Sequence, residues 1–132
     1  MAVLEATNVS VFNHSIVAGS RVTSANKRIF SCHVTGEFTG TYAQADNARF
    51  TDLHTEIANS LRSGSTVALV DAAFAQIGSE SDGTLLGAKT VAVSGTNVTM
   101  ELTTGDLSTE HGNAAIVNDV PLAFAVTYTV DP

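Results

Sequence analysis

The sequence predicts a mainly β fold, a β-sandwich or barrel-like antiparallel structure with one α-helix around residues 44–62; an α+β arrangement is the alternative. Three observations lead to this fold class. Residues 88–103 can be paired as a β-hairpin, and residues 122–130 alternate strictly between apolar and small or polar side chains. Helical periodicity is clear only in residues 44–62.

The hairpin is the best specified element of the sequence. Gly95 and Thr96 suit a two-residue type II′ turn, which takes glycine first. The expected cross-strand pairs are Val93 with Val98, Val91 with Met100, Ala92 with Thr99, and Thr90 with Glu101. The first two pairs lie on a buried face and the last two on an outer face. Because a slip of one residue would invert both faces, the register is well determined.

The first forty residues read as three strands, at 2–12, 16–23 and 28–38, with a break at 13–15 and a turn at 24–26. In the third strand, the alternation places Phe30, Cys32 and Val34 on the buried face and His33 on the outer one. Cys32 is the single cysteine, so the chain forms no internal disulfide, and we expect a small buried apolar residue there.

The expected helix follows from the spacing of Phe50, Leu53, Ile57 and Leu61 within residues 44–62. Acidic residues come early in it, and glycine follows at position 64, as the helix dipole and a C-cap favour. Since the helix lies between strands, we expect it to cover an open face or an end of the β-structure.

The remainder of the chain completes a single β-rich domain, residues 1–132. A strand is expected at 65–77 and a polar loop at 78–83. Residues 104–120 read as a long connection with a short helical turn near 106–111, and Pro121 precedes the final strand.

Composition excludes several function classes. Six Lys and Arg residues against thirteen Asp and Glu give a net charge of −7, which argues against nucleic-acid binding. No segment has the length and apolarity of a membrane helix or the pattern of a signal peptide, so no membrane contact is expected. Charged residues make up only 14% of the chain. A surface of Ser, Thr, Asn and Gly suits a chain that contacts other subunits.

The sequence offers little chemistry. The four histidines lack metal-ligand spacing, so we expect no metal, no cofactor and no catalytic residues. Glu110 and His111, near Asp106, form the densest titratable cluster, which we interpret as side-chain bonding within a polar loop. Asp71 interrupts an apolar strand, where an edge or interface position bonded to neighbouring backbone would explain it. If the protein were an enzyme or a ligand-binding module, Asp71, Glu110 and His111 would converge in a pocket.

Three segments together resemble the small, Ala/Thr/Val-rich virion proteins of tailed bacteriophages. They are GTYAQADNARFTDLHTEIANSLRSGSTVALVDAAFAQIG, GAKTVAVSGTNVTMELTTGDLSTEHGN and VPLAFAVTYTV, which fall between residues 36 and 130. Size and strand content make the chain most similar to a capsid decoration, or cement, protein.

The resemblance implies a non-enzymatic protein on the virion capsid surface, made in the host cytoplasm. Such a protein binds the major capsid protein, bridges neighbouring copies of it and often forms a homo-oligomer, a trimer or dimer. We expect partner contacts from the N-terminal segment, the loops at 78–87 and 104–120, and the outer face of the hairpin. The candidate contact residues are Val3, Leu4, Glu5, Asp82, Thr90, Thr99, Glu101, Glu110 and His111. A phage tail or neck subunit, and a small ligand-binding module or enzyme, are the alternatives.

Overall fold

The computed structural model describes residues 4–16, 29–44, 46–61, 66–78, 85–112 and 115–130. Its elements, in chain order, are β1 (Leu4–Ile16), β2 (Ile29–Thr41), β3 (Ala48–Phe50), α1 (Leu53–Leu61), β4 (Val67–Ile77), β5 (Leu86–Ser94), β6 (Asn97–Thr104) and β7 (Ala115–Val130). The expected turn at 24–26, and most of the strand expected at 16–23, lie outside the described residues.

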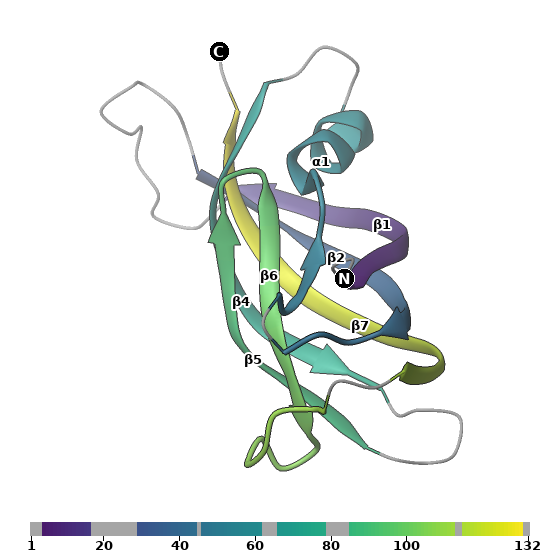
Figure 1. Cartoon of the computed structure of the whole chain (residues 1–132). Helices are drawn as coiled ribbons and strands as arrows, with labels where there is room; N and C mark the ends of the chain where they lie inside the picture. Colours follow the sequence, from purple (N-terminus) through teal and green to yellow (C-terminus); the bar gives the residue numbers. More distant parts are fainter. Residues whose placement is uncertain are drawn as a thin grey trace.

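The strands form one seven-stranded sheet in the order β4-β7-β2-β1-β3-β6-β5. The sheet curls until its two edge strands, β4 and β5, approach each other, so that it nearly closes into a barrel (Figure 1). The expected fold class, mainly β and barrel-like with one helix, is confirmed. The sheet is not purely antiparallel, because β1 and β3 pair in parallel.

The core lies inside the barrel and is built by alternation along the strands. Phe38 of β2, Phe50 of β3 and Phe124 of β7 meet there edge to face, with 4.8 Å between the ring centroids of Phe50 and Phe124. Cys32 is 1% exposed, so the expectation of a small buried residue is confirmed. Inward side chains alternate with outward ones along β2 and along the second half of β7.

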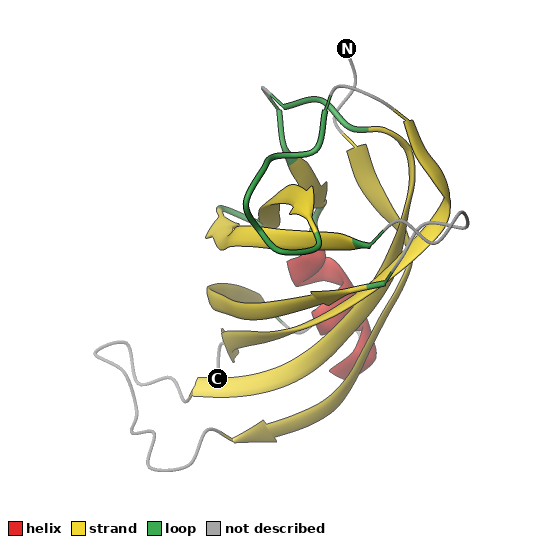
Figure 2. Cartoon of the chain, turned by 90° about the horizontal axis from the view of Figure 1, so that it is seen from below, coloured by secondary structure: helices red, strands yellow, loops and turns green. Residues whose placement is uncertain are grey.

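Helix α1 covers one end of the barrel, where Figure 2 shows it against the inner side of the curved sheet. It buries Leu53 and Ile57 against the core. The expected helix over 44–62 is right only in its second half, since Ala48–Phe50 form β3. Phe50 fits a helical period, but pairing with Val98 of β6 holds it in a strand. This pairing joins residues distant in the sequence, and local periodicity does not reveal it.

The expected break at 13–15 is not a strand end. Strand β1 runs on to Ile16 through two β-bulges, which shift its register with β2 between Thr7 and Ser10 and between Phe12 and Ser15. Asn8 and Asn13 lie in these bulges with φ of 52° and 56°. Asparagine tolerates left-handed backbone better than most residues, which is why the bulges form there.

Strand β7 is longer than expected, beginning at Ala115, so Pro121 lies within it. The Pro121 carbonyl accepts a hydrogen bond from the Gly78 amide, 2.7 Å away, on the side of β4. Because proline has no N–H, Pro121 cannot return the reciprocal bond to the Gly78 carbonyl, and β4 ends at Ile77. The short helical turn expected near 106–111 is wrong: these residues form a turn and bends that end in a β-bridge between Thr103 and Glu110.

Candidate functional site

The hairpin of β5 and β6 forms as expected next to its turn. Gly95 has φ of 63°, as the first position of a type II′ turn requires. Val93 pairs with Val98 and Ala92 with Thr99. These two expected pairs are confirmed.

Further from the turn, the expected register is wrong. Lys89, not Thr90, pairs with Glu101, because a β-bulge places Thr90 and Val91 together opposite Met100. Thr90 has φ of 55°, an unusual conformation for a β-branched residue. The bulge leaves the expected outer face open to solvent: Thr90 is exposed, while Thr99 and Glu101 are partly exposed.

The bulge also creates an ion pair. Lys89 Nζ lies 3.3 Å from Glu101 Oε2, with the two side chains 44% and 24% exposed. At this exposure the pair contributes less than about 1 kcal/mol to stability.

The outer face of the hairpin continues across β3 and β1. Thr99 pairs with Arg49 of β3, and Arg49 pairs with Glu5 of β1. Glu5 is exposed, and its Oε1 accepts a hydrogen bond of 2.7 Å from Thr51 Oγ1. We call this surface the hairpin face and define it by Glu5, Arg49, Lys89, Thr90, Ala92, Thr99 and Glu101.

Among the expected contact residues that the structure describes, Leu4, Glu110 and His111 do not belong to the hairpin face. Leu4 is buried in the core and 4% exposed, so its expected role as a contact is wrong. The reason is the strand period, which turns Leu4 inward and Glu5 outward. Val3 and Asp82 lie outside the described residues.

Glu110 and His111 come together around a tyrosine that the sequence analysis missed. Tyr42 is fully buried, and its hydroxyl donates to Glu110 Oε2 at 2.7 Å and accepts from the Leu102 amide at 3.3 Å. The His111 ring packs edge-on against the Tyr42 ring. The His111 amide donates to the Leu102 carbonyl, which ties the loop after β6 to that strand.

This corner is suited to holding a loop. Burial, together with the hydrogen bond to Glu110, raises the pKa of Tyr42, so its hydroxyl stays a donor. In the same loop, hydrogen bonds from Thr104 and Ser108 lower the pKa of Asp106 to about 2. For Asp106 and His111 the interpretation of side-chain bonding within a polar loop is confirmed, whereas the Glu110 side chain bonds to Tyr42, outside that loop.

Asp71 lies apart from this corner. It occupies an exposed position on edge strand β4, next to a bulge, and its Oδ1 accepts from the Ala72 amide at 2.9 Å. The Asp71 carbonyl accepts from Thr127 Oγ1. The expectation of an edge position bonded to neighbouring backbone is confirmed, and Asp71 does not converge with Glu110 and His111.

A second polar cluster escaped sequence analysis. His14 bridges three elements: its Nδ1 lies 2.7 Å from Tyr128 Oη of β7, and its Nε2 lies 2.7 Å from Ser60 Oγ of α1. Position 14 belongs to the second bulge of β1, which changes the direction of the following side chain. The Asn13-His14-Ser15 break was the only signal for it in the sequence.

Donor counting fixes the direction of these bonds. The Ser60 hydroxyl donates to the Ile57 carbonyl at 2.8 Å, so it accepts from His14 Nε2–H. The other ring nitrogen of His14 then accepts from the Tyr128 hydroxyl. With Nε2 protonated, His14 is not placed to remove a proton from Ser60, so this arrangement holds α1 on the barrel and does not activate a nucleophile.

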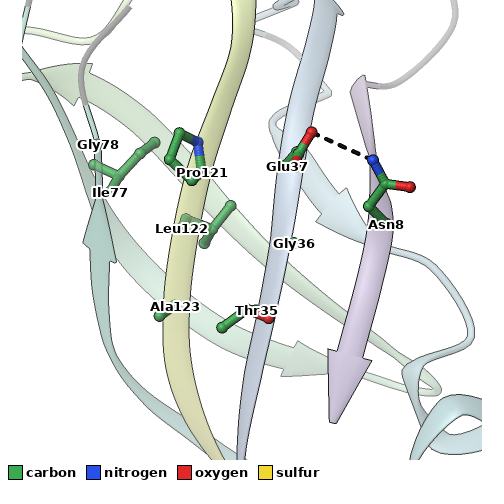
Figure 3. A pocket seen from close by; sticks show the side chains of 9 residues that line it. All are labelled: Asn8, Thr35, Gly36, Glu37, Ile77, Gly78, Pro121, Leu122 and Ala123. Carbon is green, nitrogen blue, oxygen red and sulfur yellow. Dashed lines mark hydrogen bonds between the residues drawn. The ribbon is translucent and has the colours of Figure 1, made fainter.

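One groove of about 460 Å³ crosses the described surface where β1, β2, β7 and the end of β4 meet (Figure 3). Asn8 and Glu37, on one side, are joined by a 3.4 Å hydrogen bond, and Pro121 and Gly78 form the other side. Thr35 and Ala123 also line it. Its polar side chains are few, with Asn8 exposed and Thr35 and Glu37 half-buried, and the groove is a shallow depression in a sheet surface.

The outward side chains of the paired strands β2 and β7 extend from this groove along the sheet. We call this surface the central face and define it by Ser31, His33, Thr35, Ala123, Ala125 and Thr127. Cross-strand pairs join Ser31 with Thr127, His33 with Ala125, and Thr35 with Ala123. His33 is exposed, as expected, and the other five side chains are half-buried. None of the six is Asp, Glu, Lys or Arg.

Among the described residues, no group of three or more His, Cys, Asp and Glu side chains could hold a metal ion, and no helix could cross a membrane. No protein-family model, curated protein or solved structure matches this chain. The site is therefore interpreted from its own residues.

Proposed function

We propose that this chain is a structural virion protein that binds the outer surface of a tailed-phage capsid and stabilises the shell by bridging major capsid proteins. The observation that supports this proposal most directly is the central face. Apart from the His33 ring its side chains are small, and none is Asp, Glu, Lys or Arg, so a partner can cover them without removing a carboxylate, ammonium or guanidinium group from water. The residues that could carry chemistry, Glu110, His111 and Asp71, instead make contacts within the chain.

A cement protein acts through area and repetition rather than turnover. One interface of standard size buries about 1,600 Å². Repeated contacts between a rigid subunit and a regular shell then add by avidity. A barrel whose core is tied together by long-range strand pairing is rigid enough for this role.

Capsids provide the direct test. Purified protein should bind expanded capsids that lack it, and these capsids should then resist heat and osmotic shock better. Absence of binding, or equal resistance with and without the protein, would contradict the proposal. Negative-stain images of the protein with capsids and with tails separate this role from that of a tail or neck subunit.

Two matched variants locate the docking face. Ala125→Glu places a carboxylate on the central face and should weaken capsid binding by at least about tenfold. Ala92→Glu places the same group on the hairpin face and should weaken the contact of a single subunit with the capsid much less. Melting temperatures of both variants check that the fold is intact.

A further inference from the structure

We propose that the hairpin face binds the hairpin face of a second copy of this chain through a two-fold symmetric interface. The starting observation is the order of charges across four neighbouring strands. Glu5 lies on β1, Arg49 on β3, Glu101 on β6 and Lys89 on β5, and these strands are adjacent in that order.

The charges therefore alternate as minus, plus, minus, plus across the sheet. Read in the opposite direction, the order becomes plus, minus, plus, minus. At every position, the charge in the reversed order is therefore opposite in sign to the charge in the original order. A two-fold axis reverses the strand order of one copy relative to the other. Opposite charges then meet at every strand of the interface.

The geometry of the sheet allows this pairing. An axis that lies in the plane of the face and runs between β3 and β6 puts each β3 over β6 of the second copy, and each β1 over its β5. Arg49 then faces Glu101 of the second copy, and Glu5 faces its Lys89. Glu101 and Lys89 lie one two-residue step further along their strands, about 7 Å, which side chains of this length span.

The remaining residues permit close approach. Thr90, Ala92 and Thr99 lie among the four charges and carry short side chains. Lys89 and Glu101 already form an ion pair within the chain, so neither enters the interface as an isolated charge.

Charge also distinguishes this face from the rest of the described surface. The chain carries −7, and overall repulsion opposes self-association. Arg49 and Lys89 are the two basic residues in the part of the chain that the structure describes, and both lie on the hairpin face. The hairpin face is therefore neutral overall and offers opposite charges to a like chain, which the central face does not.

The exposed edges of the sheet do not favour association by strand addition. Edge strand β4 has a bulge beside Asp71, and edge strand β5 has one beside Lys89. Bulges and charges at an edge disfavour pairing with another strand. A face is thus the more suitable surface for a second copy.

Charge exchange within the face tests the proposal. The double variant Lys89→Glu/Glu101→Lys preserves the ion pair within the chain and the net charge. It changes the order to minus, plus, plus, minus, so that every pair across the two-fold becomes a like pair. Sedimentation equilibrium of the purified full chain should show a wild-type dimer and at least about a tenfold increase in the dissociation constant for the double variant.

Reversing all four charges provides the matched restoration. Adding Glu5→Lys and Arg49→Glu to the double variant gives plus, minus, plus, minus, and dimerisation should return. Glu56→Lys on α1, an exposed position away from the face, should leave the dimer in place. A monomeric or trimeric wild type, a double variant that associates as well as wild type, or a fourfold variant that stays monomeric would each overturn the proposal. Because capsids are absent from this experiment, its result is independent of the capsid-binding role.

Discussion

Two buried tyrosines fasten the ends of this barrel. Each places its ring in the core and its hydroxyl on a polar partner from another segment: Tyr42 on Glu110, and Tyr128 on His14. Burial raises the pKa of Tyr128 to about 12, so its hydroxyl remains a donor over the whole physiological range. The loop after β6 and helix α1 are held by side-chain hydroxyls in addition to apolar packing.

Cys32 should be unreactive in the folded chain. It is 1% exposed, and burial raises the pKa of its thiol to about 11, so almost no thiolate is present at pH 8. We expect a disulfide reagent such as dithionitrobenzoate to label native protein far more slowly than protein in urea. Rapid labelling of native protein would show that β2 opens locally.

His14 should make stability depend on pH. Burial lowers its pKa below the ordinary value of 6.5, and in the folded state its Nδ1 accepts from Tyr128. The unfolded chain therefore binds the proton more readily, so this contribution to stability is complete above pH 6.5 and is lost as pH falls through the folded pKa. Urea unfolding between pH 7.5 and 5 should show a steeper loss of unfolding free energy for wild type than for His14→Gln. Parallel slopes would contradict the assignment.

At the scale of elements, the Phe50 ring of β3 packs so close to the backbone of β2 that one position of β2 requires glycine. A Cβ on Gly36 would lie 2.7 Å from Phe50 Cε2 and 3.4 Å from the Thr7 carbonyl oxygen. Phe50 is held by Phe38 and Phe124 and has little room to move. The close approach therefore fixes the spacing of the barrel wall.

Gly36→Ala should reduce the free energy of unfolding by about 1–3 kcal/mol, because it overpacks the core. Gly112→Ala is the matched control, since a Cβ there meets nothing within 4 Å, and it should change stability by less than about 0.5 kcal/mol. Both values come from urea denaturation. Equal stability of the two variants would mean that Phe50 moves freely.

Elements determined by local sequence were predicted well. The hairpin is correct through Ala92 because Gly95 and the adjacent alternation fix the register near the turn. It fails at Lys89, where the bulge depends on how β5 curves along the barrel. The helix predicted at residues 48–50 is wrong for a similar reason, since these residues form β3 by pairing with β1 and β6.

In the candidate site, too, some features were predictable from the local sequence and others depend on distant segments. Alternation placed Thr90, Thr99 and Glu101 on an outer face, and the structure agrees. Arg49 and Glu5 join that face only because β3 brings β1 beside the hairpin sheet. His14 and Ser60 are 46 positions apart, and no spacing rule connects them.

For the whole molecule, the gap between β4 and β5 leaves two strand edges that need protection. Asp71 protects the edge of β4 against pairing with another strand, because its carboxylate lies beside a bulge. Asp71→Thr should raise light scattering and thioflavin binding on incubation at high concentration. Glu56→Gln removes one negative charge from α1, and this variant should aggregate less than Asp71→Thr. Equal aggregation of the two variants would mean that the effect comes from net charge alone.

The sequence by itself determined the β class, the hairpin turn, the buried Cys32 and the second half of the helix, because each depends on neighbours along the chain. Only the tertiary structure decided the near-closure of the barrel, the parallel β1–β3 pair and the bulges. It also decided which charges share the hairpin face. These features arise from pairing between distant segments, where curvature and packing select one register among several that the local pattern permits.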